Sequence, residues 1–137
     1  MNDILHKTIS TIPAEIPTTC DKEWTLDQVI KKLKENNAAP IIVVEDLNPV
    51  GIITERDILN RVVGNTLELK KSLVKDYMTE SPVCLKQSDP ILKAYLKMRM
   101  GNFRHIVVLD DEKHLSSVLS ARDLLDYVFD SLEKVSN

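Results

Sequence analysis

The sequence predicts an α/β protein of the α+β kind, built from one β-α-β-β-α unit that occurs twice. The main observation is internal repetition, because the segment 50–62, VGIITERDILNRV, returns as 116–128, SSVLSARDLLDYV, at an offset of 66 (116 − 50). The segment 39–46, APIIVVED, returns as 104–111, RHIVVLDD, at an offset of 65 (104 − 39). Each copy also alternates β-branched runs with stretches of helical periodicity, which favours strands joined by helices.

Length and composition are those of an ordinary globular chain. With 137 residues, 43% of them hydrophobic and 28% charged, the chain can bury a compact core. A formal net charge of −3 and an isoelectric point near 5.6 disfavour general nucleic-acid binding, which needs a basic excess. No apolar run approaches the roughly 18 residues of a membrane span, and the polar start MNDILHKTIS lacks a signal-peptide core. We expect a cytoplasmic protein without a membrane segment.

The first copy runs from an extended segment, 18–20, through an amphipathic helix to the β-branched run 41–44. A charged turn, 45–49, leads into a third strand, 50–53, and a second helix follows. The residues that we expect the two helices to bury are Leu26, Val29, Ile30 and Leu33 in the first and Ile58, Leu59, Val62 and Val63 in the second.

The second copy has the same order. Its strands are predicted at 83–85, 106–109 and 115–119, with a charged turn at 110–113 between the last two. The residues that we expect its two helices to bury are Leu92, Tyr95, Leu96 and Met98 in the first and Leu124, Leu125, Val128, Phe129 and Leu132 in the second.

These repeats set the predicted domain organisation, with a first unit at 9–66, a connection at 67–79 and a second unit at 80–132. One copy alone buries only a modest core, so we expect the two units to pack, related by a pseudo-twofold axis, into one compact domain. The segments ISTIP, 9–13, and VKDYM, 74–78, predict a short helical lead before each unit.

The candidate binding motif lies where a strand gives way directly to a helix at Thr54. The first N–H groups of a helix lack intrahelical partners, and a helix N-terminus attracts phosphate. Gly51 lets a ligand or a neighbouring backbone come close, and the Asp57 carboxylate suits the adjacent hydroxyls of a ribose. The same spacing is close to that of a capping box, which starts a helix without any ligand. A duplication copies a cap as readily as a site, so both interpretations stay open for Thr54, Arg56 and Asp57 and for their counterparts Ser120, Arg122 and Asp123.

Taken with the lead VKDYMTESPV at 74–83, these segments resemble a pair of CBS domains (cystathionine-β-synthase domains), also called a Bateman module. The resemblance covers about residues 9–130 and implies a stand-alone CBS-pair protein. It implies a regulatory module without catalysis that binds AMP, ADP, ATP or S-adenosylmethionine, and a homodimer formed through the helices. The regulated protein, and whether Mg²⁺ accompanies a triphosphate, are left open.

The resemblance also implies two clefts, each combining the strand–helix motif of one unit with strand edges of the other. We expect the first cleft to bind an anionic nucleotide more tightly, because it offers an aromatic side chain and a guanidinium that can grip phosphate. The second has Ser117 where the family prefers glycine. The first cleft would contain Gly51, Thr54, Arg56, Asp57, Val83, Phe103, Arg104 and His105, and the second Thr18, Thr19, Ala38, Ala39, Pro40, Ser120, Arg122 and Asp123.

Other side chains give weaker signals. Cys20 and Cys84 have no CxxC or metal-ligand spacing and are interpreted as buried thiols. His105 is either a phosphate contact or a histidine at a strand edge, and Trp24 is interpreted as an anchor to the core. No metal site is predicted.

Catalysis is not supported, because the chain has no nucleophile elbow and no Walker loop. Asp57 and Asp123 fit ligand clamps better than an acid–base pair, since they lie in separate copies. A regulatory nucleotide sensor is therefore the leading hypothesis. The alternatives are a protein-interaction scaffold with vestigial clefts and a nucleic-acid-binding accessory protein that uses local basic patches.

Overall fold

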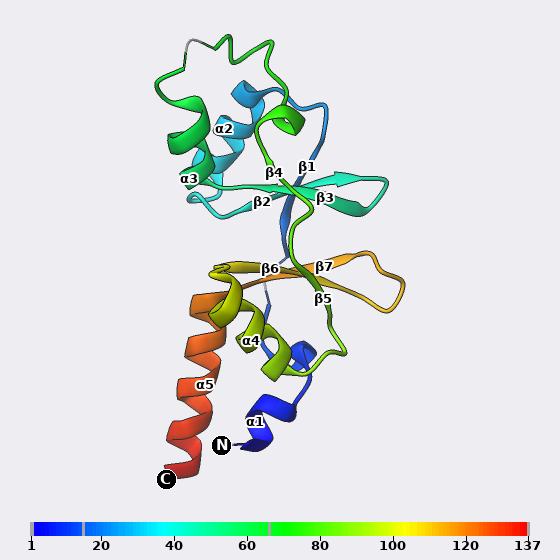
Figure 1. The fold of residues 1–137 in the computed structure, drawn as a ribbon, viewed down its shortest axis with the longest axis vertical. Helices are drawn as coiled ribbons and strands as arrows, with labels where there is room; N and C mark the ends of the chain where they lie inside the picture. The colour runs from blue at the N-terminus through cyan, green and yellow to red at the C-terminus, as the bar shows by residue number, and fades with distance from the viewer. Residues whose placement is uncertain (1, 15, 66, 137) are drawn as a thin grey trace. The chain divides into compact units, whose positions relative to one another are not determined.

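Two β-sheets and five α-helices make up the described chain (Figure 1), which in this computed structural model comprises residues 2–14, 16–65 and 67–136. The chain divides into two compact units, one of residues 17–82 and one that joins the described parts of 1–16 and 83–137. Each unit holds one sheet. The predicted α+β fold, with β-α-β-β-α occurring twice, is confirmed.

The unit of residues 17–82 has a sheet of order β1-β2-β3-β4, in which β1 and β2 are parallel and the other pairs antiparallel. Helix α2 begins at a capping box, because Thr25 Oγ1 accepts from Gln28 N while Gln28 Oε1 accepts from Thr25 N. The elements are β1 (Thr18–Asp21), α2 (Leu26–Glu35), β2 (Ile41–Glu45), β3 (Asn48–Ile53), α3 (Glu55–Asp57), a π-helical turn (Ile58–Val62), a 3₁₀ turn (Val74–Asp76) and β4 (Thr79–Glu80).

The second unit has a sheet of order β5-β6-β7, in which β5 and β6 are parallel and β6 and β7 antiparallel. Figure 1 shows α4 and α5 on the same side of this sheet. The elements are α1 (Asn2–His6), a 3₁₀ turn (Ile9–Thr11), β5 (Cys84–Lys86), α4 (Ile91–Gly101), β6 (His105–Leu109), β7 (Leu115–Ser120) and α5 (Ala121–Ser136).

The two hairpins differ in length at their turns, across which the offset between the repeated segments changes from 65 to 66. Asp46 and Leu47 form the first turn with φ angles of 50° and 69°, and two successive positive φ angles are typical of a type I′ turn between twisted strands. The second hairpin has a longer loop between β6 and β7, in which Asp110 Oδ1 accepts from Glu112 N at 2.9 Å and from His114 N at 3.0 Å.

The short leads pack differently from the sequence repeats. Both predicted leads are 3₁₀ turns, but the first, Ile9–Thr11, packs with the second copy, where Ile9 N donates to Asp89 O at 2.9 Å. The stretch predicted as a connection packs on the first copy, because Leu26 N donates to Ser72 O and Val74 N donates to Trp24 O, both at 2.8 Å. The compact units are therefore 17–82 and the described parts of 1–16 with 83–137.

Each unit has its own hydrophobic core between its sheet and its helices. Trp24 lies partly buried against the core of the first unit, so its interpretation as an anchor is confirmed. The fully buried centre of that core includes Leu26, Val29, Ile41, Val43, Ile53 and Val74, and the other core is centred on Ile91, Ala94, Ile106, Val108, Leu119 and Leu124.

The predicted buried faces of the helices are partly wrong. Leu59 and Val63 are exposed, whereas in the π-helical turn after Asp57 Val62 is buried and Ile58 packs partly buried against the core. In α4 the core residues are Ile91 and Ala94, while Tyr95 and Leu96 are exposed. In α5 the helix buries Leu124 but exposes Leu125 and Phe129.

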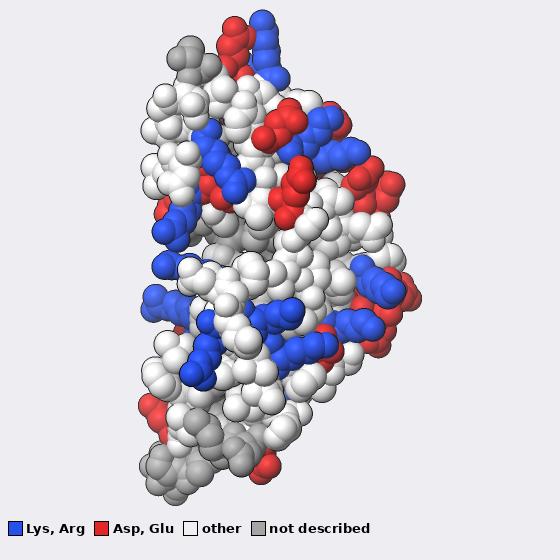
Figure 2. Space-filling view, viewed as in Figure 1, with Lys and Arg blue, Asp and Glu red and all other residues white. Residues whose placement is uncertain are grey.

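Charge is distributed unevenly over the helices of the second unit. Helix α4 carries Lys93, Lys97 and Arg99 and no acidic residue. Lys and Arg side chains gather over this helix on the face that Figure 2 shows. Helix α5, by contrast, carries four acidic residues, Asp123, Asp126, Asp130 and Glu133, against two basic ones, Arg122 and Lys134.

Gly51 in β3 is covered by the side chain of Met78, rather than open to a ligand. A Cβ placed on Gly51 would overlap Met78 Sδ and come within 2.9 Å of Met78 Cε. The absence of a side chain at this position therefore serves the packing of the lead onto the sheet.

We predict that Gly51→Ala lowers the free energy of unfolding by about 1–3 kcal/mol, because the added methyl group overpacks the contact with Met78. Urea unfolding followed by circular dichroism measures this change. In a Met78→Ala background the same substitution should cost much less, and an undiminished cost there would show that Met78 is not the obstacle.

Candidate functional site

Within each unit, the predicted site residues gather at one end of the sheet. Parallel strands begin at the same edge, and the antiparallel strand of the hairpin ends there. Thr18 thus pairs with Ile41, which pairs with Ile53 immediately before Thr54. Thr18 and Thr19 lie in β1, while Ala38, Ala39 and Pro40 directly precede β2.

The corresponding end of the other unit brings together the strand starts and the second motif. His105 pairs with Ser120 across the hairpin, and Ala121 N donates to Arg104 O at 2.9 Å. Val83, just before β5, accepts from Val107 N at 2.8 Å. Each cleft predicted from the sequence takes residues from both units, and that pairing stays a prediction.

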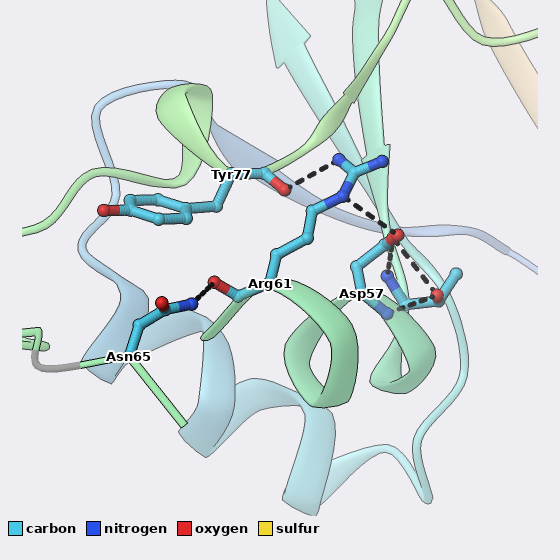
Figure 3. Close-up of polar contacts among 5 residues, drawn as sticks. Asp57, Arg61, Asn65 and Tyr77 are labelled. Atoms are coloured by element: carbon cyan, nitrogen blue, oxygen red, sulfur yellow. Dashed lines mark hydrogen bonds and ion pairs between the residues drawn. The ribbon is translucent and has the colours of Figure 1, made fainter. Parts of the chain in front are cut away.

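Thr54 and Asp57 form a complete capping box at the start of α3 (Figure 3). Asp57 Oδ2 accepts from Thr54 N at 2.9 Å and from Thr54 Oγ1 at 3.1 Å, while Asp57 N donates to Thr54 Oγ1 at 3.3 Å. The carboxylate and the hydroxyl therefore satisfy each other and the first N–H groups of the helix. Arg56, next to Asp57, is exposed.

Arg61 extends this network, and the sequence analysis did not single it out. Its Nε lies 4.0 Å from Asp57 Oδ1, and its Nη1 donates to Tyr77 O at 3.1 Å (Figure 3). Asn65 Nδ2 in turn donates to Arg61 O at 2.8 Å. The spacing of four residues between Asp57 and Arg61, which brings side chains together on a helix, was the available signal.

In the described residues, the second motif, Ser120–Asp123, forms only one of the two kinds of hydrogen bond that make a capping box. Asp123 N donates to Ser120 Oγ at 3.0 Å. In the part of the chain that the structure describes, no hydrogen bond or ion pair engages the Asp123 carboxylate, and Asp123 is exposed, as is Arg122. Tyr127 stands where Arg61 stands in the first copy (127 − 61 = 66), and its hydroxyl lies 3.2 Å from Thr11 Oγ1.

His105 lies half-buried at the start of β6, between charges of opposite sign. Burial lowers the pKa of His105 below its ordinary value of 6.5, Asp123 opposes this shift, and Arg104 adds to it. A phosphate group near this imidazole would favour its protonated form, since an anion stabilises the cation. Arg104 is exposed, and a guanidinium suits phosphate because its donors form a fixed fork.

Phe103, the predicted aromatic contact to a base, lies half-exposed directly before Arg104. Its ring packs over Gly101, because a Cβ placed on Gly101 would overlap the ring atoms Cε2 and Cδ2. Phe103 also lines an apolar groove of about 570 Å³ between α4 and α5, with Tyr95, Arg104, Leu124, Leu125 and Val128 among its walls.

The described cysteine thiols are buried or half-buried, and burial keeps them in the protonated form. Burial raises the pKa of Cys20 to about 12, so this thiol stays protonated, which agrees with its interpretation as a buried thiol. Cys84 is half-buried, and burial also raises its pKa. No group of three or more His, Cys, Asp or Glu side chains is placed to hold a metal ion in residues 2–14, 16–65 and 67–136.

None of the described helices combines the length and the apolar character needed to cross a bilayer.

Comparison with known proteins identifies the family. The CBS domain model matches residues 9–64 and 74–130, so the chain belongs to the CBS domain family and carries two CBS domains. The crystal structure of the CBS domain NE2398 superposes with a TM-score of 0.80 at 22% identity and covers 90% of this chain and 98% of its own.

Two relatives at 30% identity extend the comparison. The CBS domain protein PAE2072 from Pyrobaculum aerophilum, whose structure was solved in complex with AMP, has a TM-score of 0.75 and covers 85% of this chain and 88% of its own. An uncharacterised 17.7 kDa protein of Acidianus ambivalens is 30% identical over 107 residues, 77% of this chain. The chain spans 63% and 26% of the lengths of the first two curated relatives that it matches.

The position of His105 generates a pH prediction. Because its pKa is lowered in the folded state, the unfolded chain binds more protons on acidification, so stability present above pH 6.5 should fall as the pH drops through the folded-state pKa. Urea unfolding at a series of pH values from 7.5 down to 5.0 measures this loss. His105→Gln should flatten the dependence, whereas His6→Gln, at an exposed position in α1, should leave it unchanged.

Proposed function

We propose that this chain is a regulatory module that binds an adenine nucleotide and has no catalytic activity of its own. The observation that carries the proposal is the repeated strand–helix junction, Thr54–Asp57 and Ser120–Asp123, in a CBS-domain pair with a relative at 30% identity that binds AMP. A nucleotide bound at such a junction would stabilise one arrangement of the units, and a partner protein would sense the change in populations.

The chemistry of these junctions suits a nucleotide monophosphate or a similar adenosyl ligand. A carboxylate accepts hydrogen bonds from the two ribose hydroxyls, while Arg104 and His105 offer donors for phosphate. Half-exposed Phe103 offers an aromatic face for the base. The assembly of residues from both units into two clefts belongs to this proposal, as does Mg²⁺ when the ligand is a triphosphate.

We further propose that the module acts as a homodimer through the helices of its second unit. These helices expose large apolar side chains, among them Met100 at 83%, Phe129 at 54% and Leu125 at 50%. Exposed apolar patches mark interaction sites. Basic α4 and acidic α5 also complement each other, so that α4 of one copy can pair with α5 of a second.

Isothermal titration with AMP, ADP, ATP and S-adenosylmethionine tests the binding proposal. We expect at least one of them to bind with a micromolar dissociation constant, roughly 8 kcal/mol of binding free energy, and GMP to bind more weakly because its base differs. If folded protein binds none of these ligands, the proposal fails and the scaffold with vestigial clefts takes its place.

The dimer proposal predicts that Leu125→Asp and Phe129→Asp each shift the protein to a monomer, because each places a charge in an apolar interface. Sedimentation-velocity centrifugation over a range of protein concentrations measures the species present. Leu47→Asp is the matched control, since Leu47 is 64% exposed in the hairpin turn between β2 and β3, in the other unit. A wild-type chain that is monomeric at every concentration would overturn the proposal.

A further inference from the structure

We propose that one face of helix α4 docks an acidic segment of a partner protein, which places an apolar side chain between two lysines. This face, called here the outer face of α4, consists of Lys93, Leu96, Lys97 and Met100. The inference goes beyond the proposed function, because docking at this face involves neither strand–helix junction and requires no nucleotide. It names, by its chemistry, the kind of protein on which a regulatory module would act.

The outer face of α4 is continuous along the helix. Its residues follow the spacing i, i+3, i+4 and i+7, which places them on one side over two turns. The core of the unit takes another side of the helix, where Ile91 and Ala94 are fully buried. The outer face therefore points away from the core, and on it Met100 is 83% and Leu96 41% exposed.

A groove of about 410 Å³ runs along this face. The outer face supplies most of its walls, and Gly101 and Phe103 supply the rest. Because Gly101 has no side chain, the ring of Phe103 can pack over the end of the helix. Met100 adds a flexible thioether, which adapts to the shape of a bound side chain. A concave apolar surface of this size suits one protruding Leu, Met or Phe side chain of a partner.

The charges beside the groove have one sign. Helix α4 carries Lys93, Lys97 and Arg99 and no acidic residue, and Figure 2 shows Lys and Arg side chains gathered over it. Among the described residues, Asp89 lies 3.6 Å from Lys93, and no ion pair engages Lys97. Carboxylates that flank the apolar side chain of a partner would pair with these ammonium groups. Such complementarity steers association and fixes the orientation of the docked segment.

A protein segment fits this face better than a nucleic acid, a membrane or a second copy of the chain. A phosphate backbone is bound through charge and has no use for an apolar groove, and a flat bilayer does not fill a concave one. The net charge of −3 also opposes polyanions as a class. In the dimer proposed above, a second copy meets the groove between α4 and α5, which Tyr95 and Arg99 line. We expect the outer face, on a different side of α4, to stay open in that dimer.

Designed helical peptides test the docking surface. The probe has leucines along one face, glutamates beside them and a fluorescent label, and its control has lysines in place of the glutamates. Fluorescence anisotropy measures binding to the wild-type chain without nucleotide. We expect the glutamate peptide to bind with a dissociation constant that rises with salt concentration. The lysine peptide should bind roughly tenfold more weakly or not at all.

Matched variants, each checked for folding by circular dichroism, locate the binding. Lys93→Glu combined with Lys97→Glu should weaken binding of the glutamate peptide by roughly tenfold or more, since it reverses both charges at the groove. Met100→Ala should weaken it by about threefold through lost apolar contact. Lys31→Glu combined with Lys71→Glu changes the net charge equally, at side chains 70% and 80% exposed in the other unit, and should leave binding within about twofold.

The inference is overturned if the wild-type chain does not bind the glutamate peptide, or if the two double variants weaken binding equally. It is also overturned if Lys93→Glu with Lys97→Glu converts a dimer to a monomer in sedimentation velocity, because the outer face would then belong to the dimer interface. Tighter binding of a single-stranded oligonucleotide or of phosphatidylserine vesicles than of the peptide would overturn it too. Failure to bind adenine nucleotides contradicts the proposed function alone.

Discussion

A helix that begins directly at the end of a strand must find acceptors for its first N–H groups, and both units of this chain meet that requirement at the end of the sheet where the candidate site residues lie. In each unit the parallel pair of strands and the returning hairpin strand place strand starts and the helix start at one edge of the sheet. The residues that satisfy the helix are therefore the ones that a ligand at this edge would meet. Capping and binding compete for the same oxygen atoms.

This competition explains how two copies of one motif can diverge. In the first copy Asp57 Oδ2 accepts from both the N–H group and the hydroxyl of Thr54, and Arg61 Nε lies 4.0 Å from Oδ1. In the second copy Ser120 provides the acceptor alone, and the carboxylate of Asp123 stays exposed. One helical turn after the aspartate, the first copy has Arg61, which reaches Tyr77 O, and the second has Tyr127, whose hydroxyl lies 3.2 Å from Thr11 Oγ1.

The sequence predicted the order of strands and helices because that order depends on local periodicity and on turn residues, such as the two that form the turn at Asp46 and Leu47. It did not predict the packing of Ile9–Thr11 with the second copy, which depends on backbone hydrogen bonds between distant segments. The faces of α4 and α5 were assigned too broadly, because exposed residues such as Leu96 and Phe129 are as apolar as buried ones. Leu59 and Val63 are exposed in and directly after a π-helical turn, which simple helical periodicity does not signal.

For the candidate site too, the sequence predicted what depends on neighbouring residues and missed what depends on contacts between distant segments. The motif residues were identified from spacing alone, and the structure places them at the expected junctions. Spacing could not show that Met78 covers Gly51, or that Arg61 reaches Tyr77, since both contacts join segments far apart in the sequence.

A crystal structure of the chain grown with AMP would test the central claim most directly. The account predicts a nucleotide at a strand–helix junction, with its ribose hydroxyls on the carboxylate of Asp57 or Asp123. A nucleotide bound elsewhere on the chain, in contact with neither carboxylate, would contradict it.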